Sequence, residues 1–251
     1  MRDDYTILAG VYDRLMRDVD YTGWSERIIA LIEGSFGKNT DLRIADCACG
    51  TFSVSIPLYL HGYDVTGIDL SEDMLQIARN KCRAEGCRIP LVRADIRSFA
   101  LHRPADVINC SCDGLNYLTS IQSVRDFFKS AHEALCAGGL LLFDVSTSYK
   151  LEKILADSYF GESREDLVYL WQNSYDPPSR VLQMDLDFFL STGEGLYTRH
   201  RETHFQRAHT DEELRAALTA EGFELLSVTD GYTEYPLRDQ SERAHYYCRR
   251  I

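Results

Sequence analysis

Hydrophobic positions along this chain follow one rhythm in the first 150 residues and another in the next 60. In the first part, short apolar runs alternate with stretches in which apolar residues recur every three or four positions, as in Val124, Phe127, Phe128 and Ala131. Short runs are typical of buried strands, and the wider spacing is typical of one helix face. The runs expected to form strands are 42–46, 63–69, 89–92, 105–110 and 140–145. This alternation predicts a mostly parallel, doubly wound α/β sheet.

Residues that favour helix ends support the same order of elements. Ser71 stands where it can cap the helix that follows the second strand. Thr210 and Glu213 form a capping-box pattern that predicts a helix through about residue 221. The helical stripe at 124–135 is expected to stop at Gly138-Gly139. The remaining elements expected are helices over 5–16 and 24–32 and strands over 223–228 and 244–249.

The second rhythm has a period of two and begins after residue 166. Segments 167–175, 181–190 and 196–207 alternate apolar with polar residues, which is typical of half-buried strands. Turn-forming residues at 176–179 and 191–193 separate them. The pattern predicts three antiparallel strands, joined by hairpins and inserted after the fifth strand of the main sheet.

The two rhythms divide the chain into three sections. Residues 1–148 are expected to hold N-terminal lid helices and the ligand-binding part of a Rossmann-like domain. Residues 149–208 are expected to form an antiparallel β cap over the site. Residues 209–251 are expected to supply the last helix and strands of that domain.

Composition narrows the class of protein. The net charge of −12 argues against a nucleic-acid partner, since phosphate binding needs a basic face. The longest apolar runs are too short to span a bilayer, and no secretory leader pattern opens the sequence. The eight cysteines show no repeated zinc-type spacing, which indicates free thiols. We therefore expect a cytoplasmic protein with no membrane partner and no bound metal.

Two acids mark the ends of the first two predicted strands. Asp46 opens the run D-C-A-C-G-T-F, in which small residues lead into a helix, and Asp69 ends the next strand. Small residues let a ligand approach the backbone closely, and a helix start offers free N–H groups. The carboxyl ends of neighbouring parallel strands share one edge of the sheet, so the pair predicts a nucleotide-sized site there.

These residues resemble the motifs of class I S-adenosylmethionine-dependent methyltransferases. The run at Asp46 is similar to their first motif, usually written D-x-G-x-G-T-G, and Asp69 matches their ribose-binding acid. Asp95 and Ile96 match the segment that flanks adenine, while Cys110 and Ser111 end the strand next to the methionine portion. The resemblance implies a doubly wound, seven-stranded Rossmann-like sheet and S-adenosyl-L-methionine as cofactor. The residues it assigns to that cofactor are Tyr12, Tyr21, Trp24, Asp46, Cys47, Ala48, Cys49, Gly50, Asp69, Leu70, Met74, Asp95, Ile96, Cys110 and Ser111.

The first motif departs from the family pattern at two positions. Ala48 and Phe52 stand where the first and third glycines usually stand. The extra methyl group of Ala48 is a small change. The phenyl ring of Phe52 has two alternatives: it narrows the methionine pocket, or it points into the sheet and packs there.

The N-terminal segment and the cap resemble those of small-molecule enzymes, including the glycine and amino-sugar N-methyltransferases. Aromatic faces stabilise a sulfonium charge. Tyr5, Tyr12, Tyr21 and Trp24 are the lid residues that could do so, with core packing of the helix as the alternative.

Proton transfer is needed when the acceptor arrives as an ammonium or a hydroxyl. His200, Glu202 and His204 share one face of the third cap strand, because side chains alternate along a strand. His204 is the preferred catalytic base, since it lies in the stretch most similar to the family's cap, and histidine titrates near neutral pH. Asn116 and Tyr117 follow the fourth strand and could hydrogen-bond an acceptor, and Tyr117 is the second catalytic candidate.

The predicted reaction is transfer of a methyl group to a nitrogen, or an oxygen, of a small molecule by in-line displacement. Orientation and exclusion of water supply much of the rate in such a reaction. Two alternatives stay open: a non-catalytic module that binds the cofactor or its demethylated product, and a nicotinamide-dependent oxidoreductase. Both a monomer and a homodimer are compatible with the sequence.

Overall fold

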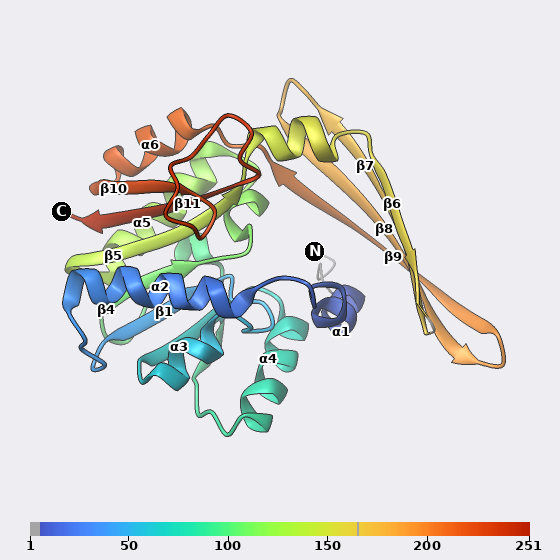
Figure 1. Ribbon diagram of the computed structural model, residues 1–251, viewed down its shortest axis with the longest axis horizontal. Helices are drawn as coiled ribbons and strands as arrows, with labels where there is room; N and C mark the ends of the chain where they lie inside the picture. Colours follow the sequence, from blue (N-terminus) through green and yellow to red (C-terminus); the bar gives the residue numbers. More distant parts are fainter. Residues whose placement is uncertain (1–5, 165) are drawn as a thin grey trace.

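A computed structural model describes residues 6–164 and 166–251 (Figure 1). Tyr5, one of the aromatic lid candidates, lies outside the described residues. The chain forms two sheets, a large one at the centre of the α/β region and a small one beside that region. The first helix, α1 (Thr6–Leu15), lies between the two.

The large sheet has seven strands in the order β10-β11-β5-β4-β1-β2-β3. Strands β1 to β5 run parallel to one another, and β11 is antiparallel to both of its neighbours, β5 and β10. The doubly wound α/β prediction is therefore confirmed. The strand bounds are β1 Arg43–Cys47, β2 Asp64–Asp69, β3 Leu91–Arg93, β4 Ala105–Cys110, β5 Leu135–Ser146, β10 Phe223–Asp230 and β11 Arg243–Arg250.

Helices cover both faces of this sheet. On one face, α2 (Tyr21–Phe36), α3 (Ser55–His61) and α4 (Glu72–Ala84) bury side chains such as Ile28 and Ile32. On the other, α5 (Ile121–Ala134) and α6 (Asp211–Ala220) bury Phe127 and Phe128. Ser71 caps α4, and a complete capping box at Thr210 opens α6, as the sequence predicts. None of the helices in residues 6–164 and 166–251 is long and apolar enough to cross a membrane.

One predicted helix end is wrong. The helix α5 ends at Ala134 rather than at Gly138-Gly139, and both glycines lie inside β5. Gly138 has a φ of 75°, and a β-carbon on Gly139 would lie 2.9 Å from the carbonyl oxygen of Cys136. The pairing of β5 with β4 shifts register between Ala105 and Val107. The glycines therefore serve an irregular strand start, where Gly138 adopts the left-handed conformation and Gly139 leaves room for a neighbouring carbonyl.

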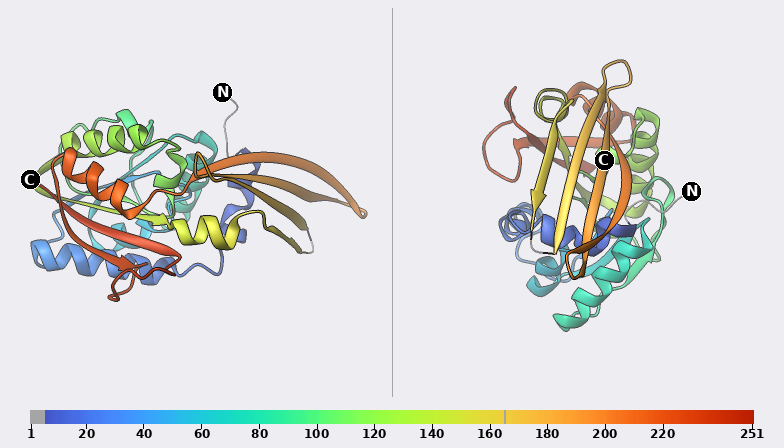
Figure 2. Two further views of the ribbon diagram at one scale, coloured as in Figure 1. Left: turned by 90° about the horizontal axis from the view of Figure 1, so that it is seen from above. Right: turned by 90° about the vertical axis from the view of Figure 1, so that its right-hand side faces the viewer.

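The small sheet is antiparallel and has four strands in the order β6-β7-β8-β9. Its bounds are β6 Tyr159–Ser163, β7 Leu167–Asp176, β8 Val181–Gly193 and β9 Leu196–Arg207. The sequence predicts only three of these strands. The missing one, β6, is a short edge strand with no buried residue, so it lacks the alternation that marks the others. Figure 2 shows that the β8–β9 hairpin reaches well beyond the end of β7.

The helix α1 joins the two sheets into one body. Leu8 and Val11 on α1 pack against Leu167, Leu186 and Phe188 on the inner face of the small sheet. This cluster is separate from the two cores of the large sheet. The inner face of the small sheet is therefore held over the carboxyl ends of the parallel strands, with α1 as the spacer (Figure 1).

Candidate active site

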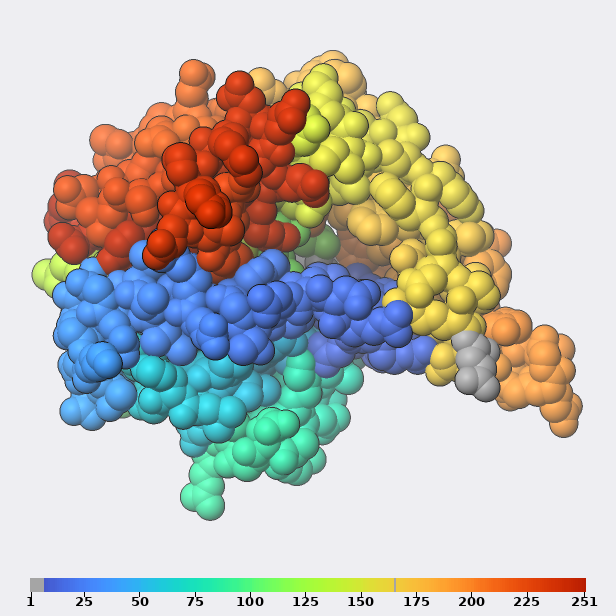
Figure 3. Space-filling view, in the orientation of Figure 1, coloured from blue at the N-terminus to red at the C-terminus, as the bar shows by residue number. Residues whose placement is uncertain are grey.

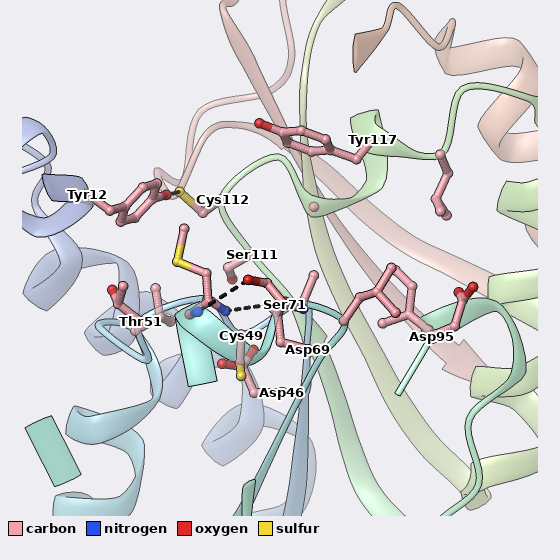
Figure 4. A pocket seen from close by; sticks show the side chains of 18 of the residues that line it. Tyr12, Asp46, Cys49, Thr51, Asp69, Ser71, Asp95, Ser111, Cys112 and Tyr117 are labelled. Atoms are coloured by element: carbon pink, nitrogen blue, oxygen red, sulfur yellow. Dashed lines mark hydrogen bonds between the residues drawn. The ribbon is translucent and has the colours of Figure 1, made fainter. Parts of the chain in front are cut away.

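A cavity of about 470 Å³ opens at the carboxyl ends of β1, β2 and β4. Figure 3 shows the surface hollowed between the N-terminal helices, the small sheet and the C-terminal segment. In the close-up of Figure 4, Asp46 and Asp69 lie on one side of the cavity, and Tyr12, Cys112 and Tyr117 lie on the other. The cavity is therefore enclosed by both the sheet edge and the lid.

Asp46 lies next to the last residue of β1, and its carboxylate is hydrogen-bonded to two neighbouring elements. Its carboxylate accepts hydrogen bonds from the Ser55 hydroxyl at 2.5 Å and from the Asn109 amide at 2.8 Å. Burial raises the pKa of Asp46 to about 6, although these two bonds oppose the rise. Asp46 therefore ties β1, α3 and β4 together beneath the cavity.

Asp69 ends β2 and holds the loop that faces it. One carboxylate oxygen accepts from the Gly50 N–H at 2.8 Å, and the other accepts from the Ser71 N–H at 2.9 Å. Burial raises the pKa of Asp69 as well, against the effect of these backbone bonds. A carboxylate oxygen can accept more than one hydrogen bond. Asp69 can therefore receive further donors from a ligand in the cavity.

In the loop between β1 and α3, every second residue from Ala48 to Phe52 has a left-handed backbone conformation. Ala48, Gly50 and Phe52 have φ angles of 53°, 52° and 70°. These are the three positions at which the first motif of the resembled family has glycine, and only glycine adopts this conformation without strain. At Ala48 and Phe52 this chain holds a side chain in a conformation that costs about 1–3 kcal/mol per residue.

The ring of Phe52 points away from the cavity. It is fully buried and belongs to the core on the α2 face of the sheet. A β-carbon placed on Gly67 of β2 would lie 2.6 Å from its Cε2 atom. Of the two alternatives open from the sequence, the packed one is therefore correct, and the cavity is not narrowed by this residue.

Asp95 lies at the far end of the cavity (Figure 4), and the adjacent Ile96 lines the cavity as well. Asp95 caps a short 3₁₀ helix, Ile96–Ser98, and its carboxylate accepts two-pronged hydrogen bonds from the Arg97 guanidinium. Those bonds keep the pKa of Asp95 below its usual value. Asp95 is therefore an ionised acceptor at the cavity wall, with Arg97 beside it.

A cysteine and two tyrosines close the other end. The Cys112 thiol lies 3.3 Å from the Tyr12 hydroxyl and 4.0 Å from that of Tyr21. Burial raises the pKa of Cys112 to about 11, so the thiol stays protonated at neutral pH. The lid helix α1 and the start of α2 thus meet the end of β4 directly across the cavity.

A buried charge cluster behind Cys112 escapes sequence reasoning. Cys112 and Asp113 are both left-handed, and both donate their N–H groups to Asp144 at 2.8 Å. Arg243 on β11 forms ion pairs with Asp113 and Asp144, and the hydroxyl of Tyr232 donates to Asp144. The only sequence signal is an acid near the end of the fifth strand. The cluster fixes a strained turn that lines the cavity.

Trp24 belongs to this cluster rather than to the cavity wall. Its ring stacks on Tyr232 at 4.5 Å, and the Arg243 guanidinium lies over it at 4.8 Å. Cys47 and Cys110 are fully buried in the core on the α5 face. These three predicted cofactor residues therefore do not line the cavity.

Of the residues predicted to contact the methyl acceptor, some line the cavity and others do not. Tyr117 lines the cavity, whereas His204 is buried behind it, with its ring edge-on to Tyr117 at 6.1 Å. The prediction that Asn116 contacts an acceptor is wrong, because its side chain is buried and bonded to the backbone of Ser146 and Arg207. His200 stands further out on β9, toward the hairpin.

Most of the predicted cofactor residues meet at the cavity. Those that line it are Tyr12, Tyr21, Asp46, Ala48, Cys49, Gly50, Asp69, Leu70, Met74, Asp95, Ile96 and Ser111. Cys112, in the segment after the fourth strand that is expected on the acceptor side, lines it as well. Thr51 and Arg97 also line it and were not predicted. Each directly follows a predicted residue, Gly50 or Ile96, so adjacency alone could have found them.

Comparison with known proteins gives relatives over the whole chain. Residues 44–139 match the family model of a methyltransferase domain. YqeM of Bacillus subtilis (strain 168), which carries a provisional methyltransferase name, is 37% identical over 243 residues, covering 96% of this chain and 95% of its own length. A protein of Geobacillus sp. (strain WCH70) with the same kind of name is 32% identical, covering 98% of this chain and 99% of its own.

Solved structures agree with this comparison. An S-adenosylmethionine-dependent methyltransferase from Clostridium acetobutylicum ATCC 824 superposes with a TM-score of 0.87 at 31% identity, covering 98% of each chain. The sugar N-methyltransferase KedS8 from Streptoalloteichus sp ATCC 53650 has the same fold, with a TM-score of 0.76 at 20% identity, and covers 95% of this chain and 92% of its own.

Proposed function

Since the chain belongs to the class I S-adenosylmethionine-dependent methyltransferases, we propose that it methylates a nitrogen, or an oxygen, of a small molecule. The observation that carries the proposal is the position of α1, which lines the cavity with Tyr12 and carries the small sheet packed against it. A macromolecular acceptor would need an open approach to the methyl group. Residues 149–208 act, in this proposal, as the acceptor-selecting cap.

The cofactor S-adenosyl-L-methionine fits the donor and acceptor groups of the cavity. Asp69 would accept from the ribose hydroxyls while Gly50 and Ser71 hold its carboxylate in place. Asp95 would accept from the adenine amino group, and Ile96 would pack on the ring. The sulfonium would lie near Tyr12 and Tyr21, whose rings suit a positive charge.

The chain's own residues then contribute orientation and proton transfer. Tyr117 would contact the acceptor, because it is the catalytic candidate that lines the cavity. His204 would take the acceptor's proton from behind Tyr117, after Tyr117 or a bound water relays it. Displacement at the methyl group needs nucleophile, carbon and sulfur in line, and the enclosed cavity excludes the water that would compete.

Amines have support from proteins of similar shape. KedS8 is a sugar N-methyltransferase, and a dTDP-amino-sugar N,N-dimethyltransferase of Saccharopolyspora spinosa is 26% identical over 138 residues. Oxygen acceptors are represented by ubiquinone biosynthesis O-methyltransferases, at 31% identity over 113 residues for the Idiomarina loihiensis protein. A mixed panel of amines, amino sugars and phenols is therefore the appropriate first screen.

The screen would measure S-adenosylhomocysteine release with radiolabelled cofactor, for native protein and for Tyr117→Phe and His204→Gln. We expect turnover with a small amine or hydroxyl compound, and a loss of kcat in both variants. Turnover only with protein or nucleic-acid acceptors would contradict the proposal. The alternative of a non-catalytic module has lost its main support, because Phe52 does not enter the cavity.

A further inference from the structure

One carboxylate contacts both the lid helix and the buried histidine. Glu202 lies on the inner face of β9, and its side chain is 11% exposed. We propose that Glu202 is a positioning residue, which orients the ring of His204 only while α1 is closed over the cavity. The inference rests on the proposed function, since it gives the proposed base a dependence on the lid.

The first oxygen of Glu202 caps the lid helix. Its Oε1 accepts from the N–H groups of Ile7 at 2.6 Å and Leu8 at 3.3 Å. The first N–H groups of a helix have no partner within the helix, and they favour a negative charge. Residues almost 200 positions apart in sequence are therefore joined by charge-assisted hydrogen bonds, which are stronger than bonds between neutral groups.

The second oxygen of Glu202 holds the histidine. Its Oε2 lies 3.2 Å from Nε2 of His204, whose side chain is 1% exposed. In a neutral imidazole, only one nitrogen carries a proton. A carboxylate at Nε2 requires the proton there, so Nδ1 is left with the lone pair that can accept one.

The two contacts together keep Glu202 ionised. Burial would raise the pKa of Glu202, but the hydrogen bonds from His204, Ile7 and Leu8 outweigh it and hold the pKa below its usual value. Loss of the α1 contacts would leave a half-buried carboxylate with one donor instead of three. A carboxylate in that condition turns toward water or a new donor, and the ring of His204 loses its fixed partner.

The opposite end of α1 is attached to the cofactor side. Asp13 accepts from the Thr51 hydroxyl at 2.6 Å and pairs with Lys81 of α4 at 3.0 Å. Thr51 follows Gly50, which Asp69 holds. The lid helix is thus fastened at its start to Glu202, which holds His204, and at its end to the cofactor loop. Closure over a bound cofactor would place α1 where Glu202 can cap it.

The test compares Glu202→Ala and Glu202→Gln with native protein, using Glu224→Gln, an exposed glutamate on β10, as the matched control. Amide hydrogen exchange is measured over residues 6–15, with and without S-adenosylhomocysteine. We expect exchange in α1 to rise 10-fold or more in Glu202→Ala and less in Glu202→Gln, which keeps one acceptor. Unchanged exchange in Glu202→Ala overturns the proposal.

A second readout distinguishes positioning from a merely structural role. Nitrogen-15 spectra of the His204 ring should show the proton on Nε2 in native protein and a mixture of both tautomers in Glu202→Ala. His204→Gln should change α1 exchange by less than 3-fold, because the cap on α1 stays in place. A single tautomer retained in Glu202→Ala overturns the inference.

These readouts need no methyl acceptor, so they separate the inference from the proposed function. If α1 exchange and the His204 tautomer both depend on Glu202 while His204→Gln keeps full turnover, the assigned base is wrong and the coupling stands. If His204→Gln loses turnover while Glu202→Ala changes neither readout, the proposed base stands and the coupling is wrong.

Discussion

The phenyl ring of Phe52 fills the space that a side chain at Gly67 would need. The first residue belongs to the loop between β1 and α3, and the second belongs to the neighbouring strand β2. The pair explains how a bulky residue is tolerated at a left-handed position. Burial of an aromatic side chain contributes about 2–3 kcal/mol, which offsets strain of similar size.

Gly67→Ala should therefore destabilise the protein by about 1–3 kcal/mol, because the new β-carbon would lie 2.5 Å from Leu91 and 2.6 Å from Phe52. Urea denaturation followed by circular dichroism would measure the change. Adding Phe52→Leu to Gly67→Ala should restore part of the loss. Gly34→Ala on α2 is the control, since nothing lies within 4 Å of the added carbon. Equal effects of the two glycine changes would contradict the packing argument.

Asp69→Ala should weaken S-adenosylmethionine binding about 10- to 1,000-fold, because up to two hydrogen bonds to a charged acceptor are lost. Isothermal titration calorimetry on folded variant protein would measure it. Asp64→Ala, at the exposed start of the same strand, is the matched control and should bind normally. An unchanged dissociation constant for Asp69→Ala would remove this residue from the proposed site.

Tyr232→Phe should cost about 1–3 kcal/mol of folding free energy. The change keeps the stacking with Trp24 but leaves Asp144, which is fully buried, without one donor. Thermal and chemical unfolding would both report the loss. Tyr235→Phe removes a hydroxyl from a tyrosine that is 70% exposed, and it should be neutral. A neutral Tyr232→Phe would show that Arg243 and the N–H groups of Cys112 and Asp113 suffice to hold Asp144.

His209 should make stability fall with acid. Burial, with help from Arg207, lowers the pKa of His209 to about 4, against an ordinary value near 6.5. The unfolded chain takes up the proton first, so stability present above pH 6.5 is lost as the pH falls toward 4, by about 3 kcal/mol. His209→Gln should flatten that part of the stability profile, whereas exposed His102→Gln should not. Parallel profiles for native protein and His209→Gln would contradict the assignment.

The sequence predicts the parallel sheet because its buried strands are continuous apolar runs between amphipathic helices. It also predicts the cavity floor, since Asp46 and Asp69 end neighbouring strands and must meet at one edge. Short polar elements fail for the opposite reason. The strand β6 buries nothing, so no hydrophobic pattern marks it, and only its pairing with β7 reveals it.

Contacts between distant segments are the other part that the sequence does not contain. The sequence predicts Trp24 as an aromatic residue of the lid. Its ring instead stacks on Tyr232 and lies beneath the guanidinium of Arg243, and both residues are more than 200 positions away. Likewise, Gly138 and Gly139 predict the end of a helix, although both lie in the irregular first part of β5. In each case the residue type is informative about local conformation, and the partner decides its role.

The position of Asn116 bears on how homologues could come to accept different methyl acceptors. Its amide bonds to the backbone of Ser146, where the chain leaves the large sheet, and of Arg207, where the small sheet ends. One buried side chain thus pins both borders of the intervening sixty residues. Recombination that exchanged this segment between homologues would leave the residues that line the cavity unchanged, while it would replace the side chains that contact α1, such as Phe188 and Glu202. We expect chimaeras joined at Ser146 and Arg207 to fold. We also expect them to use the methyl acceptors of the homologue that supplies the exchanged segment.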